Sequence, residues 1–207
     1  MKTPKKAQED RNSKKRSAPV RLSNAISLEE YKSDMEFLTN IGLANRINKF
    51  PNLANIEQHL SFYTYTMTID LGKIGVDEDI KLDNEIKAKR VKELLEIVKV
   101  LNRDIRGREE NLSPIFIIGG LYKLNSPFFL GRIKLNGKGG EFSLDIEMLK
   151  DTMTLKLGEN SIEEYTKVGI VKNVLKNEKE IEENFNTINI QEFFEELENK
   201  VEQYYKG

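Results

Sequence analysis

Residues 59–122 contain a strand, a helix, a basic loop and a second strand in that order, and this unit constrains the fold more than any other feature. Large side chains alternate with threonine over residues 59–71, a pattern typical of a β-strand with one buried face. Asp83 can then cap a helix that runs to about Asn102. One face of this helix carries apolar side chains at helical spacing, namely Ile86, Val91, Leu94, Leu95, Val98 and Leu101. The apolar run at residues 115–122 is short enough to be a buried strand.

The rest of the chain divides into three parts by composition. Residues 1–18 are almost free of apolar side chains, so burial cannot offset their ordering entropy and we expect a flexible basic segment. Residues 19–58 are interpreted as an irregular insertion, with no element assigned over 32–58. Residues 59–207 are predicted to form the core, with a hairpin turning at Asn136–Gly140 and an acidic C-terminal helix over Ile190–Tyr205. The predicted buried side of that helix is Phe193, Phe194, Leu197, Val201 and Tyr204.

Composition limits the class of protein. Hydrophobic residues make up 38% and charged residues 32%, which still leaves enough apolar side chains for a core. The chain has no cysteine, so disulfides and thiolate metal sites are excluded. No apolar run approaches the roughly 20 residues that a membrane-spanning helix needs. We therefore expect a cytoplasmic protein that makes no contact with a membrane.

The net charge of −1 conceals an uneven distribution. Residues 1–24 contain eight basic and two acidic side chains, whereas residues 176–207 contain four lysines and nine glutamates. Only the distribution of charge is informative about partners. The chain is basic at one end and acidic at the other.

Side chains suited to catalysis are scarce, so we expect no enzyme, no metal and no cofactor. His59 is the single histidine of the chain, which excludes a multi-histidine metal site, and a structural role or a polar contact is its expected role. Acids such as Glu109 and Glu110 are adjacent in sequence, and adjacent residues on a helix do not share a face. The glycine pairs do not have the spacing of a phosphate-binding loop.

Basic residues provide the candidate binding site. Arg103, Arg106 and Arg108 surround Gly107, and guanidinium groups beside exposed backbone N–H groups suit a phosphate backbone. A second interpretation is that these arginines interact with the C-terminal dipole of the preceding helix. The lysine-rich N-terminal segment is also open to two interpretations, since it can bind nucleic acid or only aid solubility.

Several longer strings point to a known family. They are Ser17–Leu28, Asp34–Ala44, His59–Tyr65, Ile69–Leu71, Lys89–Val91, Leu94–Leu95, Leu101–Arg108, Leu112–Gly120 and Asn125–Phe129. Together they span about residues 16–150, and the string around Arg106 is the most specific. In these strings the chain resembles the DevR-type backbone subunit of subtype I-B Cascade, a CRISPR surveillance complex.

The resemblance implies an α+β fold, with a palm like an RNA-recognition motif (ferredoxin-like), inserted fingers and a thumb-like hairpin. Copies of such subunits line up along CRISPR RNA, hold its backbone and present its bases to target DNA. The expected partners are therefore CRISPR RNA, the target DNA strand, further copies of the chain and other Cascade subunits. Arg103, Arg106, Gly107 and Arg108 lie where the family has an RNA-contacting loop. Further RNA-binding candidates are Lys14, Lys15, Arg16, Arg21 and Arg46.

The chain departs from the family pattern at its start, because members begin with a palm strand and helix that this sequence lacks. We therefore expect a palm that is incomplete at its N-terminus, with a sheet edge that another chain must cover. Two functions remain open from the sequence. One is an RNA-binding scaffold, and the other is a protein–protein interaction module, or an inactive fragment of such a subunit, without RNA binding of its own.

Overall fold

The computed structural model describes residues 16–32, 34–138 and 140–207. Its body is built around a three-stranded sheet of β11 (Phe116–Gly120), β16 (Thr166–Ile170) and β17 (Thr187–Asn189), in the spatial order β11, β16, β17. The central strand β16 runs antiparallel to β11 and parallel to β17. Helix α4 (Glu178–Asn184) lies in the crossover that joins the two parallel strands.

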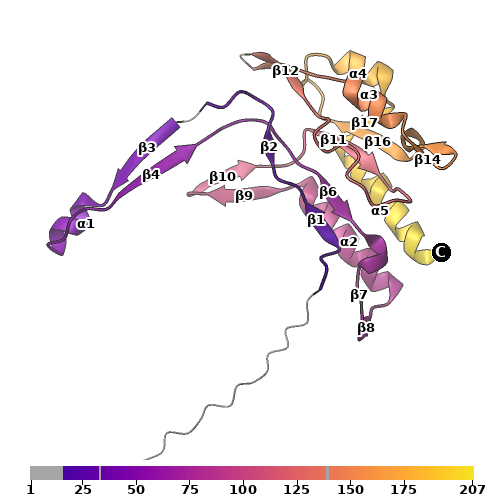
Figure 1. Cartoon of the computed structure of the whole chain (residues 1–207), viewed down its shortest axis with the longest axis horizontal. Coiled ribbons are helices and arrows are strands. Elements are labelled where there is room, and N and C mark those ends of the chain that lie inside the picture. The colour runs from indigo at the N-terminus through magenta and orange to yellow at the C-terminus, as the bar shows by residue number, and fades with distance from the viewer. Residues whose placement is uncertain (1–15, 33, 139) are drawn as a thin grey trace, which may run out of the picture.

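Helices α2 (Asn84–Lys99) and α5 (Ile190–Lys206) cover one face of this sheet (Figure 1). Their shared core contains Val91 and Leu95 from α2, each 1% exposed, and Phe194 from α5, also 1% exposed. The Tyr205 hydroxyl donates to the Leu71 carbonyl at 2.7 Å. Burial of the Tyr205 side chain raises its pKa to about 12. These contacts fix α5 against the chain that leads into α2.

The opposite face of the sheet is covered by α3 (Glu147–Met153) and α4. Side chains alternate between the two cores along β11: Ile117 packs with the α2–α5 core, whereas Phe116 and Ile118 pack with the other one. Leu149, Ile162 and Ile181 are fully buried in this second core. The result is an α+β fold in three layers, which confirms the predicted fold class.

Gly169 in β16 sets how closely α5 approaches the sheet. A Cβ at this position would lie 2.7 Å from Ile117 Cγ2 and 3.1 Å from Phe193 Cβ. Gly119 in β11 is less crowded, because a Cβ there would meet only Phe193 Cζ, at 4.0 Å. The absence of a side chain at position 169 therefore brings α5 into contact with the sheet.

The α2–α5 contact also holds a group of charged side chains. Glu198 Oε1 is buried and has no hydrogen-bond partner among the residues that the structure describes. Burial raises the pKa of Glu198, and the adjacent Glu96 carboxylate raises it further. Glu96 itself accepts a hydrogen bond from Lys99 Nζ at 2.7 Å, which lowers the pKa of Glu96. Lys92 binds Glu202 across the same helix pair at 3.2 Å.

Short ribbons and two short 3-10 helices surround this body. The ribbons are β1 (Val20–Leu22) with β6 (Met67–Ile69), β2 (Ile26–Ser27) with β5 (Tyr63–Thr64), β7 (Val76–Asp77) with β8 (Ile80–Lys81), β12 (Leu135–Lys138) with β13 (Glu141–Leu144), and β14 (Lys156–Leu157) with β15 (Asn160–Ser161). The 3-10 helices are η1 (Leu71–Lys73) and η2 (Ile162–Tyr165). The β12–β13 ribbon confirms the hairpin predicted at Asn136–Gly140.

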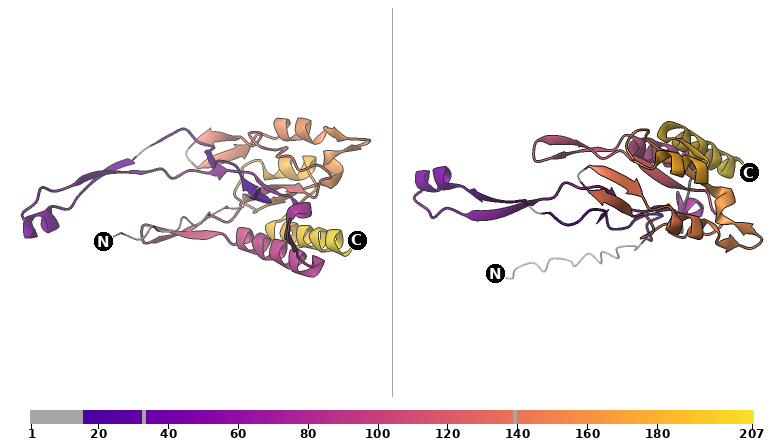
Figure 2. Two further views of the ribbon diagram at one scale, coloured as in Figure 1. Left: turned by 60° about the horizontal axis from the view of Figure 1, so that its bottom comes forward. Right: turned by 90° about the horizontal axis from the view of Figure 1, so that it is seen from above.

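Two ribbons project from one end of the body (Figures 1 and 2). The first, here called the arm, is residues 34–58: strand β3 (Asp34–Thr39), helix α1 (Ile41–Arg46) at the tip and strand β4 (Leu53–Gln58). The second, here called the basic hairpin, is β9 (Asn102–Ile105) paired with β10 (Arg108–Asn111). No element was predicted over residues 32–58, and the loop predicted at residues 103–108 is wrong, because these residues belong to the two strands and the turn of the basic hairpin.

Three further details of the predicted elements are wrong. The strand expected over residues 59–71 is two short strands, because Ser23 Oγ accepts the Thr66 N–H at 2.9 Å and so ends the β1–β6 ladder there. In α2, Ile86 is 43% exposed although it was placed on the buried face. In α5, Tyr204 is 50% exposed and Tyr205 takes the buried position, at 7%. The α2 and α5 helices themselves are confirmed.

Candidate nucleic-acid interface

The basic hairpin has one basic face and one acidic face. Its register pairs Arg108 with Ile105 and Glu110 with Arg103, and directly paired residues in an antiparallel ribbon point to the same side. Arg103 and Arg108 therefore share a face, together with Glu110, which lies directly opposite Arg103. Asp104 and Glu109 are paired with each other on the other face. The register thus places both strand arginines on a face with one acid and leaves only acidic charges on the opposite face.

Arg106 and Gly107 form the turn at the tip of the basic hairpin, and both have positive φ, 57° for Arg106 and 77° for Gly107. This is the two-residue turn in which asparagine followed by glycine is the favoured pair. The Asp104 carboxylate accepts the Gly107 N–H at 2.7 Å and stabilises the turn. An arginine in the left-handed region costs about 1 kcal/mol or more relative to glycine. Such local strain at an exposed tip favours a role for the Arg106 side chain itself.

The remaining predicted RNA-binding residues are dispersed. Arg46 lies at the end of α1, at the tip of the arm, and is exposed. Arg16 forms an ion pair with Asp77 in the β7–β8 ribbon, so its charge already has an acidic partner. Arg21 lies in β1 and donates through Nη2 to Ser17 Oγ at 3.0 Å. Lys14 and Lys15 lie outside the described residues.

Aromatic side chains near the base of the arm form a cluster that the sequence analysis missed. The His59 ring lies 5.3 Å from the Tyr31 ring and 5.8 Å from the Tyr63 ring, measured between ring centroids. His59 Nδ1 and the Tyr63 hydroxyl are 2.7 Å apart, so the polar contact expected for His59 is confirmed. Tyr31 remains 66% exposed. Exposed aromatic rings are the surfaces on which unpaired bases stack.

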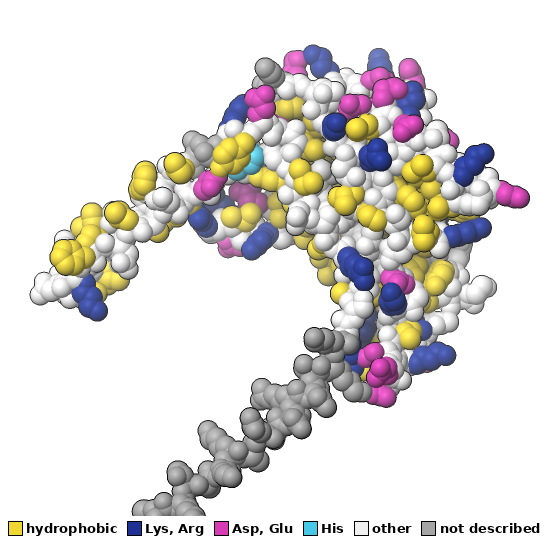
Figure 3. Space-filling model, viewed as in Figure 1, with side chains coloured by type: hydrophobic (Ala, Val, Ile, Leu, Met, Phe, Trp, Pro, Cys, Tyr) yellow, Lys and Arg dark blue, Asp and Glu magenta, His cyan; other side chains and the backbone are white. Residues whose placement is uncertain are grey.

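The arm carries many exposed apolar side chains (Figure 3). Phe37 is 70% exposed, Phe50 96% and Leu53 75%. A two-stranded ribbon by itself buries little apolar surface and is only marginally stable. Contiguous exposed apolar surface of this kind marks an interaction site. The arm is therefore the second surface of the molecule that requires a partner.

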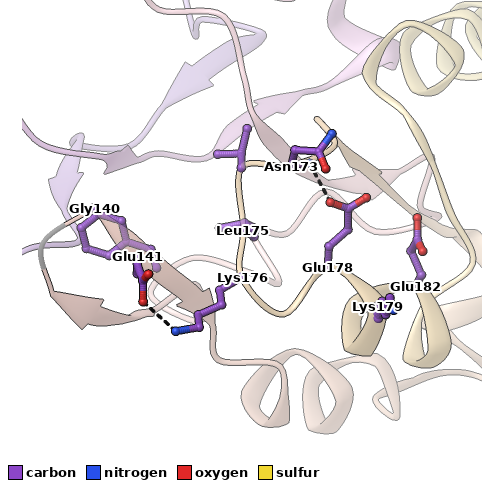
Figure 4. A pocket seen from close by; sticks show the side chains of 10 residues that line it. Gly140, Glu141, Asn173, Leu175, Lys176, Glu178, Lys179 and Glu182 are labelled. Carbon is purple, nitrogen blue, oxygen red and sulfur yellow. Dashed lines mark hydrogen bonds and ion pairs between the residues drawn. The ribbon is translucent and has the colours of Figure 1, made fainter.

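A surface hollow of about 740 Å³ lies between the β12–β13 ribbon and α4 (Figure 4). Its carboxylates have partners: Lys176 Nζ donates to Glu141 at 2.6 Å, and the Asn173 N–H donates to Glu178 at 2.7 Å. The hydrogen bond and charge of Lys176 lower the pKa of Glu141. Glu182 is paired as well, with Lys172 at 3.5 Å, so Lys179 is the charged side chain of the described lining without a partner, and one lysine is not a convergent set of polar groups for a ligand.

Within residues 16–32, 34–138 and 140–207, no group of three or more His, Asp or Glu side chains is placed to hold a metal ion. No helix in that part of the chain is long and apolar enough to cross a membrane.

Comparison with protein families identifies the chain as a CRISPR-associated protein. It belongs to the family described as CRISPR-associated negative auto-regulator DevR/Csa2, whose model matches residues 3–138. That span includes the arm and the basic hairpin and ends with β12. No curated protein and no solved structure matches the chain significantly. The match confirms the resemblance at the level of the family, while the assignment to subtype I-B stays a prediction.

Proposed function

We propose that this protein is an RNA-binding scaffold subunit, not an enzyme, that oligomerises along a CRISPR RNA and presents the RNA for pairing with target DNA. The family assignment supports a CRISPR role in antiviral defence. The proposal includes subtype I-B, further Cascade subunits as partners and a cytoplasmic location. In such a complex the guide supplies sequence specificity, and the protein contacts backbone shape and charge.

The basic face of the basic hairpin is the observation that carries the proposal. Arg103 and Arg108 are diagonal neighbours on that face, which also carries Glu110, and Arg106 lies at the tip. None of the three arginines forms an ion pair within the described part of the chain. An arginine fork binds two phosphate oxygens at once. A projecting ribbon with three such forks can follow a phosphate backbone over more than one nucleotide.

The arm supports the oligomeric part of the proposal. Its exposed apolar side chains need a protein surface, because a phosphate backbone offers no apolar contact. A subunit that repeats along an RNA requires a heterologous contact, in which one surface of each copy meets a different surface of the next. We assign the arm to that contact.

Purification with cellular RNA tests the proposal. We expect the wild-type protein to retain CRISPR RNA at low salt, and a variant with Arg103, Arg106 and Arg108 changed to alanine to lose most of it. Arg90→Ala is the matched control, because Arg90 is an exposed arginine on α2, away from the hairpin. Recovery of random RNA, or equal recovery with the triple variant, would overturn the proposal.

A protein–protein interaction module without RNA is the second candidate function, and the apolar arm is the observation that favours it. The uneven charge of the chain would allow the acidic α5 of one copy to meet the basic segment of another, but this contact has less support. Glu196 and Glu202 of α5 already bind lysines of the same chain, Lys167 at 3.7 Å and Lys206 at 2.6 Å. Particle size measured before and after nuclease separates the two functions. Assemblies unchanged by nuclease favour the second.

A further inference from the structure

A hollow of about 270 Å³ lies between the β1–β6 ribbon and the turn that contains Asn125 and Pro127. Strand alternation determines which side chains face it. Met67 and Ile69 pack against the α2–α5 core, so Thr68, between them, points outward. Arg21 is paired directly with Thr68 in the ribbon and lies on the same outer face.

The polar groups of the hollow are held in place and can still form hydrogen bonds with a ligand. The Arg21 guanidinium is positioned by two hydrogen bonds that it donates, from Nη2 to Ser17 Oγ at 3.0 Å and from Nε to the Ala18 carbonyl at 3.4 Å. Its remaining N–H groups are free to bind an anion. The hydroxyls of Thr66 and Thr68 and the amide of Asn125 make no hydrogen bond to any residue that the structure describes.

Ser23 fixes the geometry of this set. Its hydroxyl oxygen accepts the Thr66 N–H at 2.9 Å and its proton goes to the Asn24 carbonyl at 3.0 Å. The Ser23 N–H in turn donates to the Thr66 carbonyl at 2.9 Å. Both backbone groups of Thr66 are therefore bonded to Ser23, directly after β1, so the backbone that carries the Thr66 side chain needs little ordering when a ligand binds.

We infer that this hollow binds one ribose-phosphate unit of single-stranded RNA and recognises its 2′-hydroxyl. Arg21 binds the phosphate, and the Thr66 and Thr68 hydroxyls with the Asn125 amide bond the ribose. The inference rests on the proposed function, which it extends from backbone charge to the choice between RNA and DNA. Pockets for a drug-sized ligand measure about 300–1,000 Å³, so a space slightly below that range suits a sugar and a phosphate with the base outside.

The 2′-hydroxyl is the group that distinguishes RNA from DNA, and it both donates and accepts hydrogen bonds. Threonine hydroxyls and an asparagine amide can also do both. Arginine alone cannot make the distinction, because the phosphate is the same in RNA and DNA. Preference for RNA therefore depends on the three neutral side chains, and affinity for both polymers depends on Arg21.

Paired binding measurements test the inference. A single-stranded RNA and the DNA of the same sequence are titrated with the wild-type protein and with the double variant Thr66→Val, Thr68→Val. Valine keeps the shape of threonine and its preference for strands while removing the hydroxyl. The loss of one or two neutral hydrogen bonds should weaken RNA binding roughly threefold to tenfold. DNA binding should stay within about twofold, since no 2′-hydroxyl is involved.

Two controls complete the test. Thr64→Val removes a hydroxyl from the neighbouring strand β5, outside the hollow, and should change neither affinity. Arg21→Ala should weaken RNA and DNA binding by similar factors. Equal effects of the double valine variant on both polymers, or no effect on RNA, would overturn the inference. Failure of the proposed function is a distinct result, because the wild-type protein would then bind neither polymer.

Discussion

Changing Arg106 to asparagine should improve the turn of the basic hairpin and at the same time weaken RNA binding. Arg106 has a φ of 57°, a region that asparagine enters more readily than arginine. Asparagine before Gly107 is also the preferred pair for this turn. The relief of strain should be about 1 kcal/mol, which corresponds to a roughly fivefold smaller population of the open hairpin. The charge that the substitution removes lies at the exposed tip of the hairpin.

Amide hydrogen exchange measures the first effect, through the N–H groups of residues 102–111 that pair across the hairpin. Salt titration of RNA binding measures the second. Each phosphate contact on a single strand contributes about 0.7 to the slope of log affinity against log salt concentration, so the slope should fall by about 0.7. In the control Arg90→Asn, both the slope and the hairpin exchange should stay at their wild-type values.

Arg106→Asn should therefore stabilise the hairpin and weaken RNA binding, and the two measurements test these effects separately. A variant with slower hairpin exchange but an unchanged salt slope would show that Arg106 does not contact phosphate. A variant with faster exchange would show that the arginine side chain stabilises the turn by contacts other than the backbone geometry described here. Either result would remove the strained turn as support for RNA binding.

Three further predictions concern packing, pH and assembly. Gly169→Ala should destabilise the fold by about 1–3 kcal/mol in urea unfolding, because the alanine Cβ would lie 2.7 Å from a side-chain carbon of β11. Gly119→Ala should be nearly neutral. Equal effects of the two variants would contradict a role for Gly169 in helix–sheet packing. The pKa of Glu198 is raised, so its contribution to stability is lost as pH rises above the ordinary glutamate value of 4.5. Glu198→Gln should therefore stabilise the protein at pH 8 but not at pH 4 in the same assay. An equal gain at both pH values would show that ionisation of the carboxyl is not the cause. Phe50→Ser should reduce the size of RNA-bound assemblies in light scattering more than Leu60→Ser, since Leu60 is as exposed but lies outside the arm; an unchanged size would exclude the arm from the contact between copies.

The helices were predictable because their pattern is local. In α2 and α5 the apolar side chains recur every three or four residues, and that spacing identifies a helix without knowledge of its neighbours. The prediction of buried residues was wrong where contacts with distant parts of the chain determine which side chain is buried. Tyr204 and Tyr205 are adjacent aromatic residues, and which of them is buried depends on a hydrogen bond from Tyr205 to Leu71, 134 residues earlier in the chain.

The strand predicted over residues 59–71 failed for a related reason. Alternating side chains show that a segment suits an extended backbone, but they do not identify the strand with which it pairs. Residues 63–64 pair with β2 and residues 67–69 pair with β1, and Ser23 separates the two ladders. The hollow beside Thr66 and Thr68 exists only because of this pairing. No sequence pattern could have identified it.

Periodicity in the sequence indicates the helices, and local composition shows three arginines around Gly107, because both are properties of neighbouring residues. The α+β fold class followed from the resemblance of longer strings to a family, and the family model matches residues 3–138. The tertiary structure decided which face each charge occupies. Arg103, Asp104, Arg108 and Glu109 are mixed in the sequence, and only the hairpin register places the two arginines on one face, with Glu110, and Asp104 and Glu109 on the other. That separation requires pairing across a turn, and it is the feature that makes the loop suited to a phosphate backbone.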